Sequence, residues 1–384
     1  MAIIEMKRNE KYKIETFIGY NKDGKKIRIY ETFDGKKSEA KIRDMELKKK
    51  AKKGTLIDNN NLTFEQLADI WFKNYANTNL EEKTIEGYNS MILIINKSIG
   101  SYKINKIKPI MLEEFYNSLR KREEDKKQLS ENTILHYYVF ISAIFNKAIK
   151  WQLADVNPNK SINRPKLVKK QARFYDVEQV RLLLEKVDNE SLKYQSLIRL
   201  AIDSGARAGE ILGLEWEDIN FKTGSISITK TIISTNNDGI KEKDKPKNNS
   251  SIRNIPITAE TLSTLKLFKE EQAQLKDKLG NKWLNCKKVF TSDLGGYMHT
   301  STPNHILQKI INKHGLPATI CFHSLRHSSA SLQIALGIHM KTISKRLGHA
   351  NSSTTDMIYS HISSSLDDEV VNKMNMLFNT KKDS

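Results

Sequence analysis

The amino-acid sequence predicts a multidomain protein: a small β-sheet plus one helix at the N-terminus, an all-α domain in the middle, and a mixed α+β, mainly helical domain at the C-terminus. Two observations support this fold class. A chain of 384 residues is long enough for two or three domains that each bury a core. The spacing of apolar residues also changes along the chain, from alternation to helical periodicity and then to a mixture of both. We place the domain boundaries at 1–55, 62–165 and 174–384.

Residues 1–55 are expected to contain two or three strands and one helix. Tyr12–Tyr20 and Lys26–Phe33 are rich in β-branched and aromatic residues, and the turn signal Asn21–Gly24 lies between them. A lysine-rich helical pattern follows and ends at Gly54, as helices often end at glycine. The alternative for this region is a solvated basic tail, because so small a domain has almost no core.

Residues 62–165 are expected to be helical throughout. Thr63 and Gln66 have the spacing of a capping box at the start of the first helix. Further helical patterns cover 84–98 and 109–121, and Ser130 caps a fourth helix. The apolar stripe of this fourth helix consists of Ile134, Tyr138, Ile141, Phe145 and Ala148. We expect the aromatic residues on these stripes to be core residues.

Residues 174–384 show the periodicities of both helices and strands. Helical patterns cover Val177–Val187 and Lys193–Ser204. Short strands are predicted at Ser225–Thr229 and Ser251–Ile257, with a polar stretch, 234–249, between them. The remainder is predicted to be mostly helical.

The chain is strongly basic, with 64 Lys and Arg against 45 Asp and Glu and a formal net charge of +19. Such an excess attracts polyanions, because each Lys or Arg set against a phosphate releases condensed counterions. Nucleic acid is therefore the expected partner. The alternating aromatic residues Tyr12, Phe17, Tyr20 and Tyr30 then favour, within residues 1–55, a small sheet that lays its strands on DNA.

The sequence also predicts the compartment in which the protein works. It contains no run near the roughly 18 apolar residues that would indicate a membrane span. The N-terminus, MAIIEMKRNEKYK, has no apolar signal core, so we expect a cytoplasmic protein that does not contact membranes. Cys286 and Cys321 are the only cysteines, and their separation favours two structural thiols in a reducing compartment.

Several kinds of cofactor and metal site are excluded by the motifs. The chain has neither the GxxxxGK[ST] phosphate loop nor the GxGxxG dinucleotide fingerprint, and we expect no cofactor. His323 and His327 are four residues apart, as helix-borne zinc ligands are, but no Glu lies between them to act as a base. Arg326 does lie between them and would repel a cation, so we expect no metal.

Four residues in three segments of the C-terminal region stand out as a set. Arg207 lies in SGARAGEILGLEWEDI, and Arg326 lies in FHSLRHSSAS. His349 and Tyr359 lie in KRLGHANSSTTDMIYSH. Taken singly, an Arg, His or Tyr of this kind is usually a surface charge or a structural residue. Only the combination indicates a site.

The segments ARAGEILGL, HSLRH and LGHANSSTTDMIYSH, in this order and at this spacing, resemble the signature boxes of the tyrosine recombinase (phage integrase) family. The resemblance is sharpest over 174–365 and extends more loosely over 62–160. The first 55 residues are similar to the arm-site-binding sheet of many phage and mobile-island integrases. The resemblance implies an arm-site DNA-binding domain, a core-site DNA-binding domain and a catalytic domain, in that order.

The resemblance implies a role for each residue of the set. Tyr359 would attack the scissile phosphate and form a 3′-phosphotyrosine. Arg207 and Arg326 would bind the phosphate, because their planar groups match its oxygens in a bidentate way. Lys247, on a hairpin between the first arginine and the HSLRH segment, would protonate the leaving 5′ oxygen, with Lys245 as the alternative.

Further residues are assigned from the same motifs. His323 would assist proton transfer at the nucleophile or hold the phosphate, and His349 would donate a hydrogen bond to a non-bridging oxygen. Glu210, one helical turn after Arg207, could orient that guanidinium through an ion pair. The alternative for Glu210 is an exposed helix residue. His327 is expected to support packing near the site.

The function implied is that of a site-specific recombinase that integrates or excises a mobile genetic element by cutting and rejoining DNA strands. Its partners would be double-stranded DNA at core and arm sites, further protomers in a tetramer on DNA, and DNA-bending accessory factors from the host or the element. Two other functions stay open: a type IB topoisomerase-like nicking and closing enzyme, and a catalytically inactive DNA-binding regulator. The tail after Tyr359 has a short apolar face that could dock on a neighbouring protomer or pack on its own.

Overall fold

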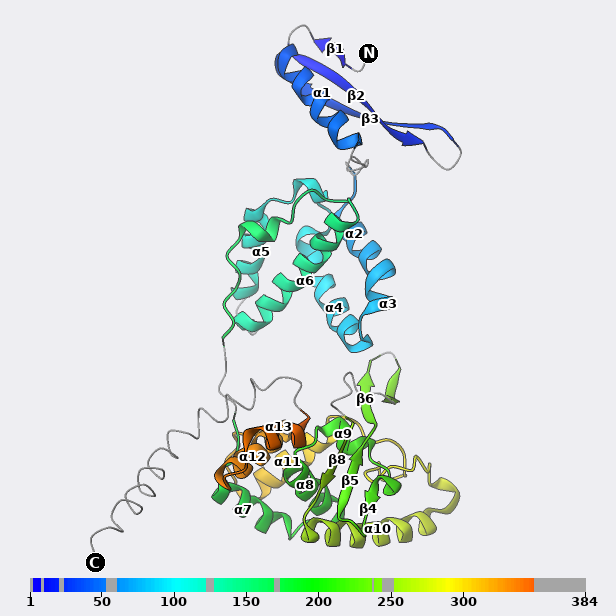
Figure 1. Cartoon of the computed structure of the whole chain (residues 1–384), viewed down its shortest axis with the longest axis vertical. Coiled ribbons are helices and arrows are strands. Elements are labelled where there is room, and N and C mark those ends of the chain that lie inside the picture. The colour runs from blue at the N-terminus through cyan, green and yellow to red at the C-terminus, as the bar shows by residue number, and fades with distance from the viewer. Residues whose placement is uncertain are drawn as a thin grey trace, which may run out of the picture. The chain divides into compact units, whose positions relative to one another are not determined.

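The computed structural model of the chain (Figure 1) describes residues 3–7, 10–20, 24–52, 61–121, 128–168, 173–236, 238–243 and 252–348. The chain divides into two compact units, Met1–Lys169 and Lys170–Ser384. Four of the predicted site residues, Lys245, Lys247, His349 and Tyr359, lie outside the described residues, as does the tail that follows them. Within the described part of the chain, no helix is both long and apolar enough to cross a membrane.

The N-terminal region of the first unit is an antiparallel sheet with the strand order β1-β2-β3, and one helix packs against it. The elements are β1 (Ile3–Lys7), β2 (Lys11–Tyr20), β3 (Lys26–Asp34) and α1 (Lys37–Lys52). Residues alternate between the two faces of a strand, and the face of β2 with Tyr12, Ile14 and Thr16 is buried. The predicted sheet plus helix is confirmed, and the alternative of a solvated tail is wrong. Tyr12, which we grouped with aromatic residues that face DNA, is a core residue instead.

The second part of the first unit is helical, as predicted. Its helices are α2 (Phe64–Trp71), α3 (Asn77–Asn79), α4 (Glu82–Ile95), α5 (Pro109–Arg120) and α6 (Glu131–Lys150). The predicted capping box is present, because Thr63 Oγ1 accepts from the amide of Gln66 while Gln66 Oε1 accepts from the amide of Thr63. Trp71 and Phe140 are fully buried with their rings 5.6 Å apart, so the aromatic stripes do form the core. Two π-helical turns, Phe72–Ala76 and Asn96–Gly100, continue α2 and α4 and were not anticipated.

In its described residues, the second unit is mainly helical with two small sheets. Its helices are α7 (Val177–Val187), α8 (Leu192–Ser204), α9 (Ala208–Gly213), α10 (Ala259–Leu279), α11 (Thr302–His314), α12 (Phe322–Ala335) and α13 (Met340–Leu347). Its strands are β4 (Ile219–Asn220), β5 (Ser225–Ile228), β6 (Thr231–Thr235), β7 (Gly239–Lys243) and β8 (Arg253–Pro256). The central helix is α8, which contacts α7, α9, α10, α11 and α12 (Figure 1). Because α8 is surrounded in this way, most of its residues are buried, including polar Ser196 and Ser204.

The two sheets differ in how well the sequence predicted them. The strands expected near 225–229 and 251–257 are present as β5 and β8, which pair antiparallel. For the polar stretch between them, the residue pattern assigned no strand, and only the resemblance implied a hairpin in this region. The stretch contains most of an antiparallel ribbon formed by β6 and β7. Contacts with another element stabilise the ribbon, because β6 packs along α9.

Candidate active site

The start of α9 places Arg207 beside a buried carboxylate. Helix α8 ends at Gly205 in the left-handed conformation, with φ of 60°, and Arg207 is the residue that precedes the first turn of α9. Nη1 of Arg207 donates to Oε1 of Glu210 at 2.8 Å, and the amide of Arg207 donates to Oε2 at 3.0 Å. Glu210 is only 4% exposed, so the alternative of an exposed helix residue is wrong. The carboxylate holds both the backbone and the side chain of Arg207.

A second arginine, which the sequence analysis missed, shares the same carboxylate. Nη2 of Arg253, on β8, donates to Oε2 of Glu210 at 2.8 Å, and both side chains are buried. Burial acts to raise the pKa of Glu210, but Arg253 and Arg207 outweigh it and hold this pKa below its usual value. Glu210 is therefore ionised and bound from both sides. The only sequence signal for Arg253 was its place in SIRNIP, directly after the polar stretch.

Arg326 is a buried cation on α12. It is 2% exposed, and its Nη1 donates to the carbonyl of Gly205 at 2.8 Å. Burial lowers the pKa of Arg326 to about 9, and the charge of Arg207 adds to this, while Glu210 acts in the opposite direction. A guanidinium held in these surroundings gains stabilisation from an added anion, because the anion restores the electrostatic interactions lost with water. The pair formed by Arg207 and Arg326 is thus suited to a phosphate.

His323 lies one turn before Arg326 on the same helix. His323 is exposed at the surface, but partial desolvation by the surrounding protein still lowers its pKa, and the positive charges of Arg326 and Arg207 lower it further. The imidazole is therefore biased toward its neutral form, which can accept a proton. The ring of His327 contacts it edge-on, with ring centroids 5.1 Å apart. This contact agrees with the expected packing role of His327.

The C-terminal end of α13 packs against α12 and the end of α8. Ile343 and Leu347 pack on α12 through Ala330 and Ile334 in a small buried cluster. A Cβ atom added to Gly205 would lie 2.3 Å from Cδ2 of Leu347, so α8 and α13 approach each other as closely as a glycine allows. Helix α13 ends at Gly348, and His349 is the next residue in the sequence.

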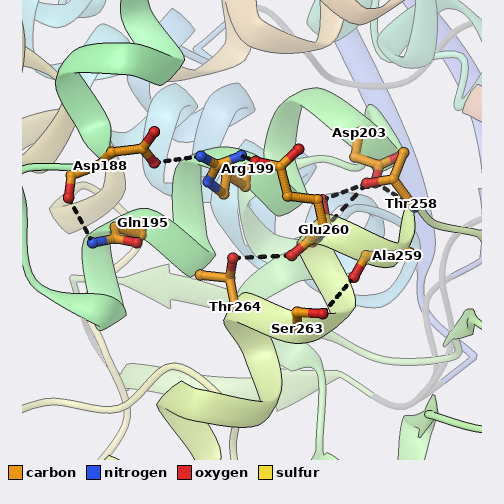
Figure 2. A network of polar contacts seen from close by, with 10 residues as sticks. Asp188, Gln195, Arg199, Asp203, Thr258, Ala259, Glu260, Ser263 and Thr264 are labelled. Atoms are coloured by element: carbon orange, nitrogen blue, oxygen red, sulfur yellow. Dashed lines mark hydrogen bonds and ion pairs between the residues drawn. The ribbon is translucent and has the colours of Figure 1, made fainter.

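Polar contacts connect α13 with the N-terminus of α10. Nη2 of Arg346 donates to both the carbonyl and Oδ1 of Asp203, at 2.9 and 3.2 Å. Figure 2 shows how Asp203 in turn receives hydrogen bonds from Thr258, which caps α10. The same figure shows Arg199 of α8 between Asp188 and Glu260. These contacts make the ends of α8, α10 and α13 one connected framework beside the arginines.

The described residues therefore bring together part of the predicted set. Arg207, Arg326, His323 and Glu210 meet where α9 and α12 approach the end of α8. Among the residues that the structure describes, no cluster of three or more His, Cys, Asp or Glu could hold a metal ion. The chemistry available here is the binding of an anionic, phosphate-like group by fixed guanidinium groups beside a neutral imidazole.

Two family models match the chain. The model of the phage integrase family matches residues 173–365, and that of the phage integrase N-terminal SAM-like domain matches residues 63–120. A protein named tyrosine recombinase XerC-like, from Caldanaerobacter subterraneus, is 29% identical over 96% of this chain and 97% of its own length. The ICEBs1 integrase of Bacillus subtilis is 26% identical over 96% of this chain and 98% of its own length.

Solved structures match in fold. The Tn1549 transposon integrase in complex with transposon right end DNA aligns with a TM-score of 0.65 and 19% identity, over 78% of this chain and 95% of that one. A lambda integrase tetramer bound to a Holliday junction aligns with a TM-score of 0.58 and 17% identity, over 92% of this chain and 93% of that one. The part of this chain that the lambda integrase alignment leaves out is shorter than the N-terminal region, residues 1–55. The fold match therefore includes part of that region. The predicted fold class and the resemblance are confirmed, and the chain belongs to the phage integrase family and is a tyrosine recombinase of the kind carried by mobile elements.

Proposed function

We propose that this recombinase integrates and excises a mobile genetic element through a covalent 3′-phosphotyrosine formed by Tyr359. The observation that carries the proposal is the meeting of Arg207 and the buried Arg326 beside His323. A metal-independent transfer of a DNA phosphate requires fixed positive charge where the pentacoordinate phosphorane becomes more negative, and preorganised donors of this kind are usually the largest catalytic contribution.

The reaction that we propose exchanges one phosphodiester for another. The phenol oxygen of Tyr359 bonds to phosphorus, the bond from phosphorus to the 5′ oxygen breaks, and Lys247 gives that oxygen its proton. The lowered pKa of His323 suits it to assist removal of the phenol proton. His349 donates to a non-bridging oxygen. A 5′ hydroxyl from a second duplex then attacks the phosphotyrosine, so that the strand is rejoined and Tyr359 is released.

The nucleophile can be tested with nicked half-site DNA that carries an end of the element. Cleavage should release a short strand and leave an SDS-resistant protein–DNA adduct in the absence of magnesium. Tyr359→Phe should abolish the adduct without weakening DNA binding, because only the phenol oxygen is removed. An adduct that persists in this variant would assign the nucleophile to another residue. No adduct with the unaltered chain would favour the inactive regulator.

Joining assays separate recombination from a topoisomerase-like activity. A recombinase should join strands from two different duplexes and produce Holliday junctions. A nicking and closing enzyme would relax supercoiled DNA and reseal each strand to its own partner. We expect recombinant products with the element's paired sites, and their absence alongside efficient relaxation would favour the topoisomerase-like function.

We propose that residues 1–55 bind arm-site DNA through the sheet face opposite α1. Lys13 and Tyr30 lie on this face, with the Lys13 ammonium 4.5 Å from the Tyr30 ring centroid. The exposed rings of Phe17 and Tyr20 contact each other edge-on, with centroids 5.3 Å apart. Cations beside exposed aromatic rings suit contact with a phosphate backbone and the adjacent sugars and bases.

Footprinting tests this face directly. Tyr30→Ala should weaken DNase protection of arm sites while protection of core sites, which we assign to residues 62–165, stays the same. Met45→Ala is the matched control, because Met45 is exposed on α1, away from the open face of the sheet. Equal arm protection by both variants would remove this face from the DNA interface.

We further propose that four protomers assemble on DNA, as the lambda integrase tetramer does on a Holliday junction, with the tail after Tyr359 docked on a neighbour. Host or element-encoded DNA-bending factors would select the direction of the reaction, in the cytoplasm of a bacterial cell. Sedimentation of complexes on junction DNA should give four protomers per junction. Removing the tail after residue 366 should reduce this number, and an unchanged tetramer would indicate that the tail packs on its own protomer.

A further inference from the structure

The most deeply buried charge among the described residues of the second unit belongs to Lys288, to which the proposed mechanism gives no role. Its side chain is 1% exposed, and it lies beside Glu215, with which it forms an isolated β-bridge. The ammonium has three donors, and each has an acceptor: the carbonyl of Gly213 at 3.1 Å, Oε1 of Glu215 at 2.6 Å and Oε2 of Glu242 at 2.5 Å. The position of the ammonium is therefore fully determined.

A second lysine completes a group of four charges. Lys230 lies 2.9 Å from Oε1 of Glu215 and 3.4 Å from Oε1 of Glu242. Burial acts to raise the pKa of Glu215, but Lys288 and Lys230 overcome it and lower this pKa to about 2. The two carboxylates and two ammonium groups are balanced in charge, so the group can stay buried.

This group connects α9 with the β6–β7 ribbon. Gly213 is the last residue of α9, whereas Glu242 lies on β7, opposite Ile232 of β6. The backbones also touch, because a Cβ atom added to Gly209 would lie 2.7 Å from the carbonyl oxygen of Ile232. A Cβ atom added to Gly213 would lie 2.8 Å from the carbonyl oxygen of Lys230. The ribbon is thus held on the helix that begins at Arg207.

We propose that Lys288 and Glu242 are positioning residues for strand cleavage, which fix the β6–β7 ribbon relative to Arg207. The inference rests on the proposed function, in which a lysine that follows β7 in the sequence protonates the leaving oxygen. Glu242 precedes Lys245 and Lys247 by three and five positions. A general acid must lie within hydrogen-bond reach of its oxygen, so the strand that precedes it must be held in a defined place.

If these residues only stabilised the fold, their variants would change the cleavage rates in a different way from variants of positioning residues. Removing one partner of a buried ion pair lowers stability, and a loss of stability would slow every reaction of the enzyme equally. Loss of the general acid alone would slow only reactions whose leaving group needs a proton. A bridging 5′ sulfur leaves as a thiolate and does not need one, whereas a bridging 5′ oxygen does.

The test compares cleavage of natural half-site DNA with cleavage of the same DNA carrying a bridging 5′ sulfur, using the full-length chain. General acids contribute about 10²- to 10⁴-fold, so Glu242→Gln should slow the natural substrate about tenfold or more and the sulfur substrate less than about threefold. Lys288→Met should show the same split. Asp238→Asn is the matched control, because it also changes an acid to its amide in the ribbon, while the ion pair of Asp238 with Lys241 stays within that ribbon.

The outcomes separate the inference from the proposed function on which it rests. Equal slowing of both substrates by Glu242→Gln, or no slowing at all, overturns the positioning role. Lys247→Ala and Lys245→Ala are measured in parallel, and the variant that sulfur rescues identifies the general acid. If sulfur rescues Glu242→Gln but neither lysine variant, the positioning role stands and the assignment of the acid to these lysines fails. Lower attraction for DNA cannot explain a loss in Glu242→Gln, since the variant removes a negative charge.

Discussion

Arg253 and Glu210 form a buried ion pair, with Nη2 of Arg253 2.8 Å from Oε2 of Glu210. The other oxygen of this carboxylate binds the side chain of Arg207, so Arg253 does not compete with it. Nε of Arg253 donates to the carbonyl of Arg346 at 2.9 Å. A single guanidinium on β8 therefore joins the first turn of α9 to the last turn of α13.

Arg253→Met should slow strand cleavage while DNA binding stays nearly constant. Loss of one partner of a buried pair is strongly destabilising, but Glu210 keeps Arg207, so we expect a cost of only about 2 kcal/mol in the free energy of unfolding. Looser placement of Arg207 should slow cleavage about tenfold or more. Arg181→Met, at an exposed position on α7, removes the same charge and should change neither the free energy of unfolding nor the cleavage rate. Equal rates for the two variants would show that Arg253 does not act on Arg207.

Two left-handed glycines give a matched pair of substitutions. Gly205 and Gly315 end α8 and α11 with φ of +60° and +63°, but a Cβ atom would meet Leu347 only at Gly205, and nothing within 4 Å at Gly315. Gly315→Ala should cost about 1–2 kcal/mol, the usual strain of a left-handed alanine. Gly205→Ala should cost about 1–3 kcal/mol more because it overpacks the buried Leu347. Urea unfolding measures both, and equal costs would mean that α8 and α13 separate easily.

Two helical glycines provide a second pair. A Cβ atom at Gly87, inside α4, would meet nothing within 4 Å, whereas at Gly209 it would lie 2.7 Å from a backbone oxygen of β6. Gly87→Ala should therefore stabilise the protein by about 0.5–1 kcal/mol, because alanine loses less backbone entropy in a helix. Gly209→Ala should destabilise it and slow cleavage, since the strand must move away from α9. A stabilised Gly209→Ala variant would contradict the close contact.

The free energy of unfolding should depend on pH through the protonation of His327. Burial, followed by electrostatic interactions with His323 and Arg326, lowers the pKa of His327 from 6.5 to about 4. Between these pH values the unfolded chain binds a proton that the folded chain does not, so the free energy of unfolding falls as the pH drops from 6.5 to 4. Above pH 6.5 this contribution is fully present.

His327→Leu should remove this part of the pH dependence. The slope of unfolding free energy against pH should become smaller by up to about 1.4 kcal/mol per pH unit between these values, the contribution of one proton. The same slope in wild type and His327→Leu would show that the ring is protonated in the folded protein.

The sequence predicted elements whose signals are local. Thr63 with Gln66 marked a helix start, and Arg207 with Glu210 marked an ion pair, because both pairs depend only on residues one turn apart. The resemblance implied a hairpin near the β6–β7 ribbon, but the residue pattern assigned no strands there, since many of its residues are polar and its stability comes from α9 and Lys288. Arg253 and Lys288 were missed for the same reason: their partners are distant in sequence.

The N-terminal sheet shows a second kind of miss. Tyr12 and Phe17 are an odd number of residues apart on one strand, so strict alternation already places them on opposite faces. The register shift between Phe17 and Gly19 then brings Tyr20 to the side of Phe17, which alternation alone would not allow. Gly19, whose φ is +147° in the structure, was the only sign of this irregularity in the sequence.

Because Lys288 is buried, its ion pair should respond to ionic strength differently from the exposed cations that contact DNA. Exposed cations that contact DNA lose affinity steeply as salt rises, because counterion release becomes less favourable. Salt screens a buried pair such as Lys288 and Glu242 far less. Raising salt should therefore reduce how many protomers are bound while the cleavage rate of each bound protomer stays constant, so that salt can be used to vary assembly without altering the chemistry.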